Sequence, residues 1–179
     1  MRRFNGGYQP KAKRPEAKQA VRNDGNVAQS TGIEHPGTSI LKVKRLHPDA
    51  VLPTRGTPGS AGLDLYAIED VEIQPDGIGE MHTGIAMEIP AGYFGLFLTR
   101  SSTGKKMVRL SAGANAADED YRGELMVYLT NDGIYPWHVH KGDRVAQIVI
   151  TPYLPCVVME VNELSETQRG AGGFGSTGR

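Results

Sequence analysis

From residue 39 onward, short apolar runs recur, separated by turn residues such as Pro75-Asp76-Gly77 and Asn131-Asp132-Gly133. Such runs, bounded by turn signals, are typical of β-strands. The expected strands span residues 40–45, 63–67, 71–73, 78–88, 92–98, 108–110, 125–130, 137–139, 145–152 and 156–161. One short helix is expected at residues 101–107, and no other segment shows a sustained 3.6-residue period. The pattern therefore predicts an all-β fold, a sandwich or barrel of short strands.

The two ends of the chain lack this pattern. Residues 1–38 have little apolar clustering and mix Gly, Pro, Gln, Asn and charge, so they bury too little surface to offset the entropy of ordering. They hold seven Lys and Arg against three Asp and Glu, a net charge of +4, and the rest of the chain is near −4. We expect a disordered basic arm at 1–38, in which a solvating role is favoured over targeting or nucleic-acid binding. A barrel at 39–164 and a Gly-rich arm at 165–179 complete the expected organisation.

Composition narrows the function classes. A chain of 179 residues has room for one domain with a real core. A net charge of zero argues against a core that coats nucleic acid or an anionic membrane. The single cysteine, Cys156, cannot form an internal disulfide and fits a reducing compartment. No apolar run reaches the length of a membrane span or a secretory signal. The expectation is a soluble, cytoplasmic protein with no membrane partner.

Two segments next to predicted strands contain charged or hydroxyl side chains that a purely structural β-domain does not need. Residues 53–65 form a loop of small residues that enters a strand carrying Asp64. A buried carboxylate needs partners, so Asp64 is either a structural tie or an active-site acid, and the structural role is favoured. Residues 100–106 offer an Arg, three hydroxyls and the N–H groups of a possible helix start, which suit an anion. A helix cap followed by solvent-facing lysines is an equally good interpretation of this segment.

Three further segments stand out. Residues 118–123 place three carboxylates beside a Tyr and an Arg, where alternation sends Asp118 and Asp120 to one side of an extended chain. Residues 142–150 run into an apolar strand that Gln147 interrupts, and an inward-facing Gln needs partners or a ligand. Residues 169–178 combine five glycines with one ring, one Arg and two hydroxyls, which suits phosphate contact and stacking on a flat ligand by a mobile arm. Taken singly, the first could be a solvated turn and the last a disordered end.

In this order and spacing, the five segments resemble the five motifs of the trimeric deoxyuridine triphosphate nucleotidohydrolases, the dUTPases, over residues 40–178. The resemblance implies a jelly-roll-like β-barrel in a homotrimer, with three active sites at subunit interfaces and the C-terminal arm of one subunit closing a site built by two others. It implies hydrolysis of dUTP to dUMP and pyrophosphate, which keeps uracil out of DNA and supplies dUMP for thymidylate synthesis. It also implies Mg²⁺, held by the substrate phosphates and water with no protein ligand.

The resemblance also assigns roles to residues. Asp118 matches the general base that deprotonates the attacking water. Residues 100–102 match the phosphate-binding motif, Tyr121 packs under the deoxyribose, Phe174 stacks on uracil and Arg169 reaches the γ-phosphate. The full set of implied substrate-binding residues is Arg100, Ser101, Ser102, Ala112, Asn115, Ala116, Ala117, Tyr121, Met126, Gln147, Arg169, Gly173, Phe174, Gly175 and Ser176.

One departure from the family pattern bears on specificity. Before Asp118 the family usually has Gly and two larger residues, whereas this chain has Asn115-Ala116-Ala117. Smaller side chains beside the base predict extra space and weaker discrimination against 5-substituted deoxyuridine nucleotides such as dTTP. Two alternatives stay open: a deoxycytidine triphosphate deaminase, which shares the barrel and an Arg-Ser-Ser motif, and a catalytically idle or moonlighting trimeric binding protein. The match at residues 169–178 argues against the first, and the presence of Asp118 argues against the second.

Overall fold

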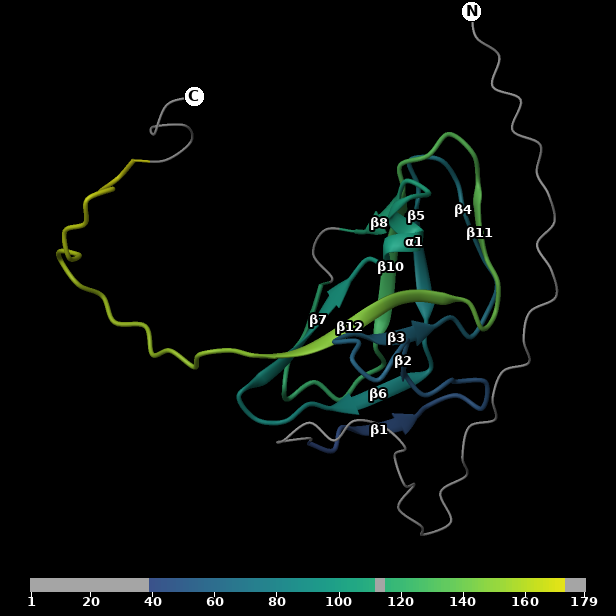
Figure 1. The fold of residues 1–179 in the computed structure, drawn as a ribbon, viewed down its shortest axis with the longest axis horizontal. Coiled ribbons are helices and arrows are strands. Elements are labelled where there is room, and N and C mark those ends of the chain that lie inside the picture. Colours follow the sequence, from purple (N-terminus) through teal and green to yellow (C-terminus); the bar gives the residue numbers. More distant parts are fainter. Residues whose placement is uncertain (1–38, 112–114, 173–179) are drawn as a thin grey trace, which may run out of the picture.

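The computed structural model describes residues 39–111 and 115–172. Its elements, in chain order, are β1 (Lys42–Arg45), β2 (Thr54–Arg55), β3 (Leu63–Tyr66), β4 (Val71–Ile73), β5 (Ile78–His82), β6 (Ile85–Glu88), β7 (Tyr93–Leu98), α1 (Ser101–Gly104), β8 (Val108–Leu110), β9 (Ala116–Ala117), β10 (Met126–Asn131), β11 (Trp137–Val139) and β12 (Arg144–Pro152). Figure 1 shows the strands wrapped around one another, with a long C-terminal segment leaving them. Within the described residues α1 is the only helix, so the all-β prediction is confirmed.

The strands pair antiparallel in four small sheets. The largest has the order β2-β3-β12-β7-β9, and the others have the orders β5-β10-β8, β1-β6 and β11-β4. The long strand β12 lies at the centre of the largest sheet because it pairs with both β3 and β7. Inward-facing side chains from these sheets form one core, whose fully buried members include Leu65, Met81, Val127, Leu129 and Ile148. The core holds β7 and β12 rigidly, and both strands carry site residues.

The expected strand at 78–88 is wrong as a single element, because it divides into β5 and β6 at Gly84. Gly84 has a φ of +65°, a left-handed conformation that side chains with a Cβ rarely adopt. A Cβ there would also lie 2.9 Å from the Cβ of His47. The Gly84 carbonyl instead accepts backbone N–H groups of Leu46 and His47, so the bend ties the β5–β6 connection to the segment after β1.

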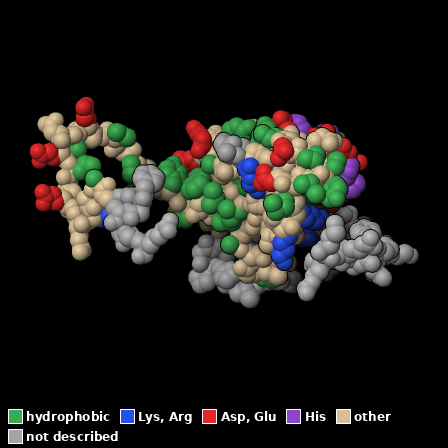
Figure 2. Space-filling view, turned by 90° about the horizontal axis from the view of Figure 1, so that it is seen from above, with side chains coloured by type: hydrophobic (Ala, Val, Ile, Leu, Met, Phe, Trp, Pro, Cys, Tyr) green, Lys and Arg blue, Asp and Glu red, His purple; other side chains and the backbone are tan. Residues whose placement is uncertain are grey.

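The expected strand at 156–161 is also wrong. The segment after β12 has no strand partner among the described residues, and the side chains of Val157 and Val158 are 96% and 95% exposed. A strand needs a neighbour to satisfy its backbone groups, so apolar alternation alone does not produce one. Figure 2 shows hydrophobic side chains on this segment standing clear of the barrel.

Smaller differences concern short elements. The two-residue strands β2 and β9 were not expected, because two residues cannot display a period. The helix expected at 101–107 is limited to α1, and the chain turns away at Met107, whose φ is +60°. In the described part of the chain, no helix is long and apolar enough to cross a lipid bilayer.

Candidate functional site

A buried carboxylate joins two arginines at one end of the largest sheet. Asp64 on β3 is 8% exposed, and its two oxygens accept hydrogen bonds from Arg100 Nε at 2.9 Å and Arg144 Nη1 at 3.1 Å. Arg100 Nη1 also donates to Ser102 Oγ and to the Arg144 carbonyl, both at 3.3 Å. Asp64 therefore has charged partners and serves as a tie between the β3, β7 and β12 ends. The Arg144 guanidinium is thus part of the same buried contact as Arg100.

Gln147 belongs to the same end of the sheet. In the strand register it lies opposite Asp64 on β3 and opposite Leu98 on β7. A Cβ at Gly62 would overlap Gln147 Oε1, so the glycine lets the loop before β3 cover this side chain. Arg100, Ser101 and Ser102 follow β7 directly, with both serines exposed on α1. The segments 53–65, 100–106 and 142–150 thus meet, as a phosphate-binding group would require.

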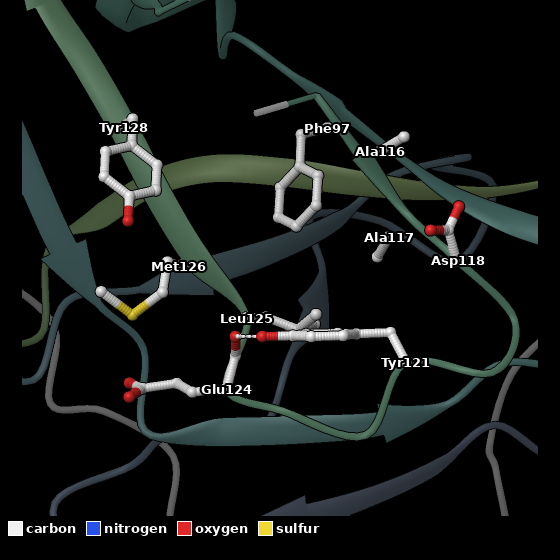
Figure 3. A pocket seen from close by; sticks show the side chains of 9 residues that line it. All are labelled: Phe97, Ala116, Ala117, Asp118, Tyr121, Glu124, Leu125, Met126 and Tyr128. Carbon is white, nitrogen blue, oxygen red and sulfur yellow. Dashed lines mark hydrogen bonds between the residues drawn. The ribbon is translucent and has the colours of Figure 1, made fainter. Parts of the chain in front are cut away.

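A second group surrounds a cavity of about 330 Å³ (Figure 3). Its walls are made by Phe97, Ala116, Ala117, Asp118, Tyr121, Glu124, Leu125, Met126 and Tyr128. The flat face of the Tyr121 ring closes one side, and the Asp118 carboxylate stands at the edge beyond Ala117 (Figure 3). The lining is mostly apolar with a few polar groups at its margin, as in small-molecule sites.

The turn that carries Asp118 and Tyr121 is held by its own hydrogen bonds. The backbone N–H of Tyr121 donates to the Asp118 carbonyl at 3.2 Å, and the Tyr121 hydroxyl donates to the Glu124 carbonyl at 3.1 Å. Arg122 Nη1 donates to the carbonyls of Glu119 and Tyr121 at 2.6 and 2.9 Å. A Cβ at Gly123 would overlap the Tyr121 hydroxyl. The glycine therefore fixes the ring across the cavity.

An ion pair lies at the outer margin of the cavity. Glu124 accepts the Gly84 N–H at 2.7 Å and faces His82 Nδ1 at 3.1 Å. The hydrogen bond to Glu124 raises the pKa of His82, an effect that outweighs the opposing effect of burial. Burial pushes the pKa of Glu124 upward, but the hydrogen bonds from Gly84 and His82 outweigh it and lower the pKa overall. Glu124 is therefore held as a carboxylate beside the cavity.

The neighbours of Asp118 line a second hollow. Phe94, Asp118, Glu119, Asp120 and Tyr153 surround it. Glu119 Oε2 accepts the Gly92 N–H at 2.6 Å. A hydrogen bond from Tyr153 to Glu119 raises the pKa of the Tyr153 hydroxyl, and burial raises it further. The first residue after β12 is thus linked to the turn that carries Asp118.

Asp118 and Arg100 lie at opposite ends of β7. Gly95 pairs with Ala117, which places Asp118 level with the start of the strand, whereas Arg100 follows its end. Six residues of extended chain span roughly 20 Å. The structure therefore brings together Asn115, Ala116, Ala117, Asp118, Tyr121 and Met126 in one place and Arg100, Ser101, Ser102 and Gln147 in another.

The remaining predicted residues belong to neither group. Arg169 lies on the exposed C-terminal segment, where its Nε donates to the Gly172 carbonyl at 2.8 Å. Ala112, Gly173, Phe174, Gly175 and Ser176 lie outside the described residues.

Sequence reasoning missed part of the cavity lining, namely Phe97, Glu124, Leu125 and Tyr128. The signal for Tyr128 was present, because side chains two apart on a strand share a face, and Met126 was already a candidate. Phe97 required knowledge of how β7 and β9 pair, which the sequence alone does not contain.

Comparison with known proteins identifies the family. The dUTPase family model matches residues 49–178. The deoxyuridine 5'-triphosphate nucleotidohydrolase of Nautilia profundicola is 42% identical over 140 residues, 78% of this chain and 99% of that protein. The enzyme of the same name from Hydrogenobaculum is 46% identical over 140 residues, 77% of this chain and 97% of that protein. The chain belongs to the dUTPase family.

Solved structures agree in fold. The dUTPase of Staphylococcus bacteriophage 80alpha, determined with dUpNHpp, superimposes with a TM-score of 0.73 at 29% identity, over 79% of this chain and all of that one. A mutant dUTPase of phage phi11 of S. aureus, described with a structural Mg(II) ion, gives a TM-score of 0.66 at 25% identity over 72% of this chain and all of that one.

Proposed function

We propose that this dUTPase hydrolyses dUTP to dUMP and pyrophosphate by attack of a water molecule on the α-phosphorus, with Asp118 as general base. Membership of the family makes the chain a dUTP diphosphatase and does not favour the deaminase alternative. The observation that carries the mechanism is the cavity itself, in which an apolar chamber for a nucleoside ends at the Asp118 carboxylate. In cells, the reaction would keep uracil out of DNA and supply dUMP for thymidylate synthesis.

Each chemical step has a group to perform it. The Asp118 carboxylate accepts a proton from water while the water oxygen bonds to the α-phosphorus. The bond between that phosphorus and the oxygen bridging to the β-phosphorus then breaks, and pyrophosphate leaves with the electron pair. A positioned base of this kind accelerates a reaction typically about 10²–10⁴-fold. Tyr121, tied to Glu124 and packed over Gly123, would lie against the deoxyribose and exclude a 2′-hydroxyl.

Recognition of the rest of the nucleotide uses the other predicted residues. The backbone and small side chains of Asn115, Ala116 and Ala117, with Met126, would contact the base. Arg100, oriented by Asp64, would bind phosphate oxygens together with Ser101, Ser102 and Gln147. The C-terminal arm would complete the site, with Arg169 on the γ-phosphate, Phe174 on the uracil ring, and Gly173, Gly175 and Ser176 along the phosphates.

We further propose a homotrimer in which each active site combines residues of different subunits. Two observations support it. Arg100 and Asp118 are separated by the length of β7, too far for one α-phosphate to lie against both in the same subunit. The segment after β12 is also apolar and exposed, with Leu154 at 82% and Met159 at 77% exposure, as expected of a segment that packs on another copy.

Mg²⁺ fits this site as a companion of the substrate. Within residues 39–111 and 115–172, no three His, Cys, Asp or Glu side chains are grouped so as to hold a metal ion together. Mg²⁺ commonly keeps several waters and binds through substrate phosphates, and the carboxylates of Asp118 and Asp120 could accept hydrogen bonds from those waters. When bound, the ion would neutralise charge on the triphosphate. A cytoplasmic location is part of the proposal and suits the free, exposed thiol of Cys156.

The decisive experiment substitutes the base. Asp118→Asn should lower kcat for pyrophosphate release from dUTP by at least about 10²-fold, with KM and melting temperature nearly unchanged. Asp76→Asn is the matched control, because it makes the same change in charge in an exposed turn where a φ of 58° suits Asn equally. Turnover close to wild type in Asp118→Asn would disprove the assignment.

A mixing experiment tests the shared site. Asp118→Asn and Arg100→Ala subunits should each be inactive alone, yet regain activity after being unfolded together and refolded as mixed trimers. Absence of any recovery, with trimers present by analytical ultracentrifugation, would refute a site shared between subunits.

A further inference from the structure

The inner wall of the cavity is formed by side chains that belong to the core. Phe97 and Ala117 are 5% and 4% exposed, and both line the cavity together with Leu125. Figure 3 shows the Phe97 ring between Tyr128 on one side and Ala116 and Ala117 on the other. The ring is therefore the bulky group next to the two alanines.

The strand register explains why Phe97 reaches the alanines. Gly95 lies opposite Ala117 in the β7–β9 pair, and the Phe97 N–H donates to the Asn115 carbonyl at 2.9 Å. Residues two apart on β7 share a face, so Phe97 is the diagonal neighbour of Ala117, a position within reach of an aromatic side chain. Gly95 contributes no side chain to this face, and a Cβ there would lie 2.6 Å from Ile148 Cδ1. Phe97 is thus a bulky side chain diagonal to Ala117, next to a glycine that adds no side chain.

The Tyr128 side of the ring is also fixed. Tyr128 lies opposite Glu80 on β5, and its hydroxyl is hydrogen-bonded to the Glu80 side chain. The Phe97 ring consequently lies between an anchored tyrosine and the backbone of β9, and it has little freedom to yield to a larger ligand. The Phe97 ring thus supplies bulk on the same cavity wall as the small side chains of Ala116 and Ala117.

We propose that Phe97 is the specificity-determining residue for the size of the pyrimidine, and that the Phe97–Ala117 pair excludes 5-substituted deoxyuridine nucleotides. The proposal rests on the proposed function for the identity of the substrate. It reverses the expectation drawn from the sequence, in which two alanines alone leave the pocket too large. Discrimination by a single methyl group in an apolar pocket amounts to about 10–200-fold, so it is sensitive to a change of this size.

The test compares kcat/KM for dUTP and dTTP across four variants. Phe97→Val should raise the dTTP to dUTP ratio about tenfold or more, because it opens space beside Ala117. Phe97→Leu should act in the same direction with a smaller change. Phe97→Val combined with Ala117→Ile should return the ratio to within about threefold of wild type, because the volume is restored from the facing strand. Ile73→Val, a buried change on β4 outside the cavity lining, should leave the ratio unaltered.

Binding measurements separate this inference from the proposed function. Calorimetric affinities for dUMP and dTMP should follow the same order in the same variants, whether or not the triphosphates turn over. If the wild-type protein releases no pyrophosphate from dUTP, the proposed function fails and the inference is judged on these affinities. An unchanged dTMP to dUMP preference in Phe97→Leu or Phe97→Val protein that melts cooperatively would overturn the role of Phe97.

Discussion

Asp64→Asn is a direct test of how the two arginines are held. The Asp64 side chain is 11% exposed and accepts Arg100 Nε at 2.9 Å and Arg144 Nη1 at 3.1 Å. Asn keeps the shape and one acceptor oxygen, but its amide nitrogen would face a guanidinium. One hydrogen bond to a charged group is therefore lost, a loss of about 1.5–3 kcal/mol in the free energy of unfolding.

Solvent exposure of the two arginines puts the expected loss in the free energy of unfolding in the lower part of that range. The Arg144 side chain is 48% exposed and regains hydration, whereas Arg100 at 19% does so only partly. We expect a loss of about 2 kcal/mol and a fall in melting temperature of roughly 6–10 °C for a barrel of this size. KM for dUTP should rise because Arg100 is less well oriented toward phosphate. Melting is measured at one protein concentration, since assembly makes the midpoint depend on concentration.

The chain contains a matched control for this change. Asp132 accepts Arg109 Nε and Nη2 at 2.7 and 3.2 Å, but these side chains are 37% and 54% exposed. Asp132→Asn should therefore lower the melting temperature far less, as expected of a surface ion pair. If Asp64→Asn and Asp132→Asn melt within about 2 °C of each other, burial does not strengthen the Asp64 contacts and the reasoning is refuted.

Three further predictions concern the termini and pH. Truncation before Arg169 should abolish turnover while leaving the melting temperature almost unchanged, and a large drop in melting temperature would show a structural arm instead. Deletion of residues 1–38 should not alter kcat/KM for dUTP, and a several-fold loss at physiological salt would contradict this. Hydrogen bonding to Glu124 raises the pKa of His82 above 6.5, so protonated His82 stabilises the folded protein fully below pH 6.5. This contribution to the free energy of unfolding is lost as pH rises through the raised pKa, and His82→Gln should make the melting temperature less dependent on pH over that range.

The sequence predicts strand positions correctly where the local hydrophobic pattern agrees with the strand pairing in the fold. The expected strands at 71–73, 108–110 and 137–139 have the observed bounds, because turn residues delimit them on both sides. Residues 78–88 were misjudged because the alternation continues across Thr83 and Gly84, and only the tertiary contact with His47 forces the bend. Residues 156–161 have strand composition without a partner, and composition carries no information about pairing.

The sequence predicted which residue types form the site but not how they are arranged in space. The motifs named Asp118, Tyr121 and Arg100, yet the sequence could not show that β7 separates Arg100 from Asp118. Nor could it show Phe97 beside the two alanines, since that neighbour comes from the register of β7 against β9. Residue types report which reactions are possible, whereas strand register decides which residues act together.

The position of β7 has a consequence for how such an enzyme works. The strand is paired on both edges, with β12 on one side and β9 on the other, and its inward residues are packed in the core. Its length is therefore a fixed distance between Arg100, the proposed phosphate ligand, and Asp118, the proposed base, within one subunit. The fit of a nucleotide bound by two copies would therefore depend on how the two subunits are positioned, and not on motion within one barrel. The Tyr153–Glu119 contact adds to this, because it links the turn that carries Asp118 to the start of the segment proposed to pack on a neighbouring copy. Assembly would then position Asp118, and catalysis would depend on contacts that no isolated subunit can make.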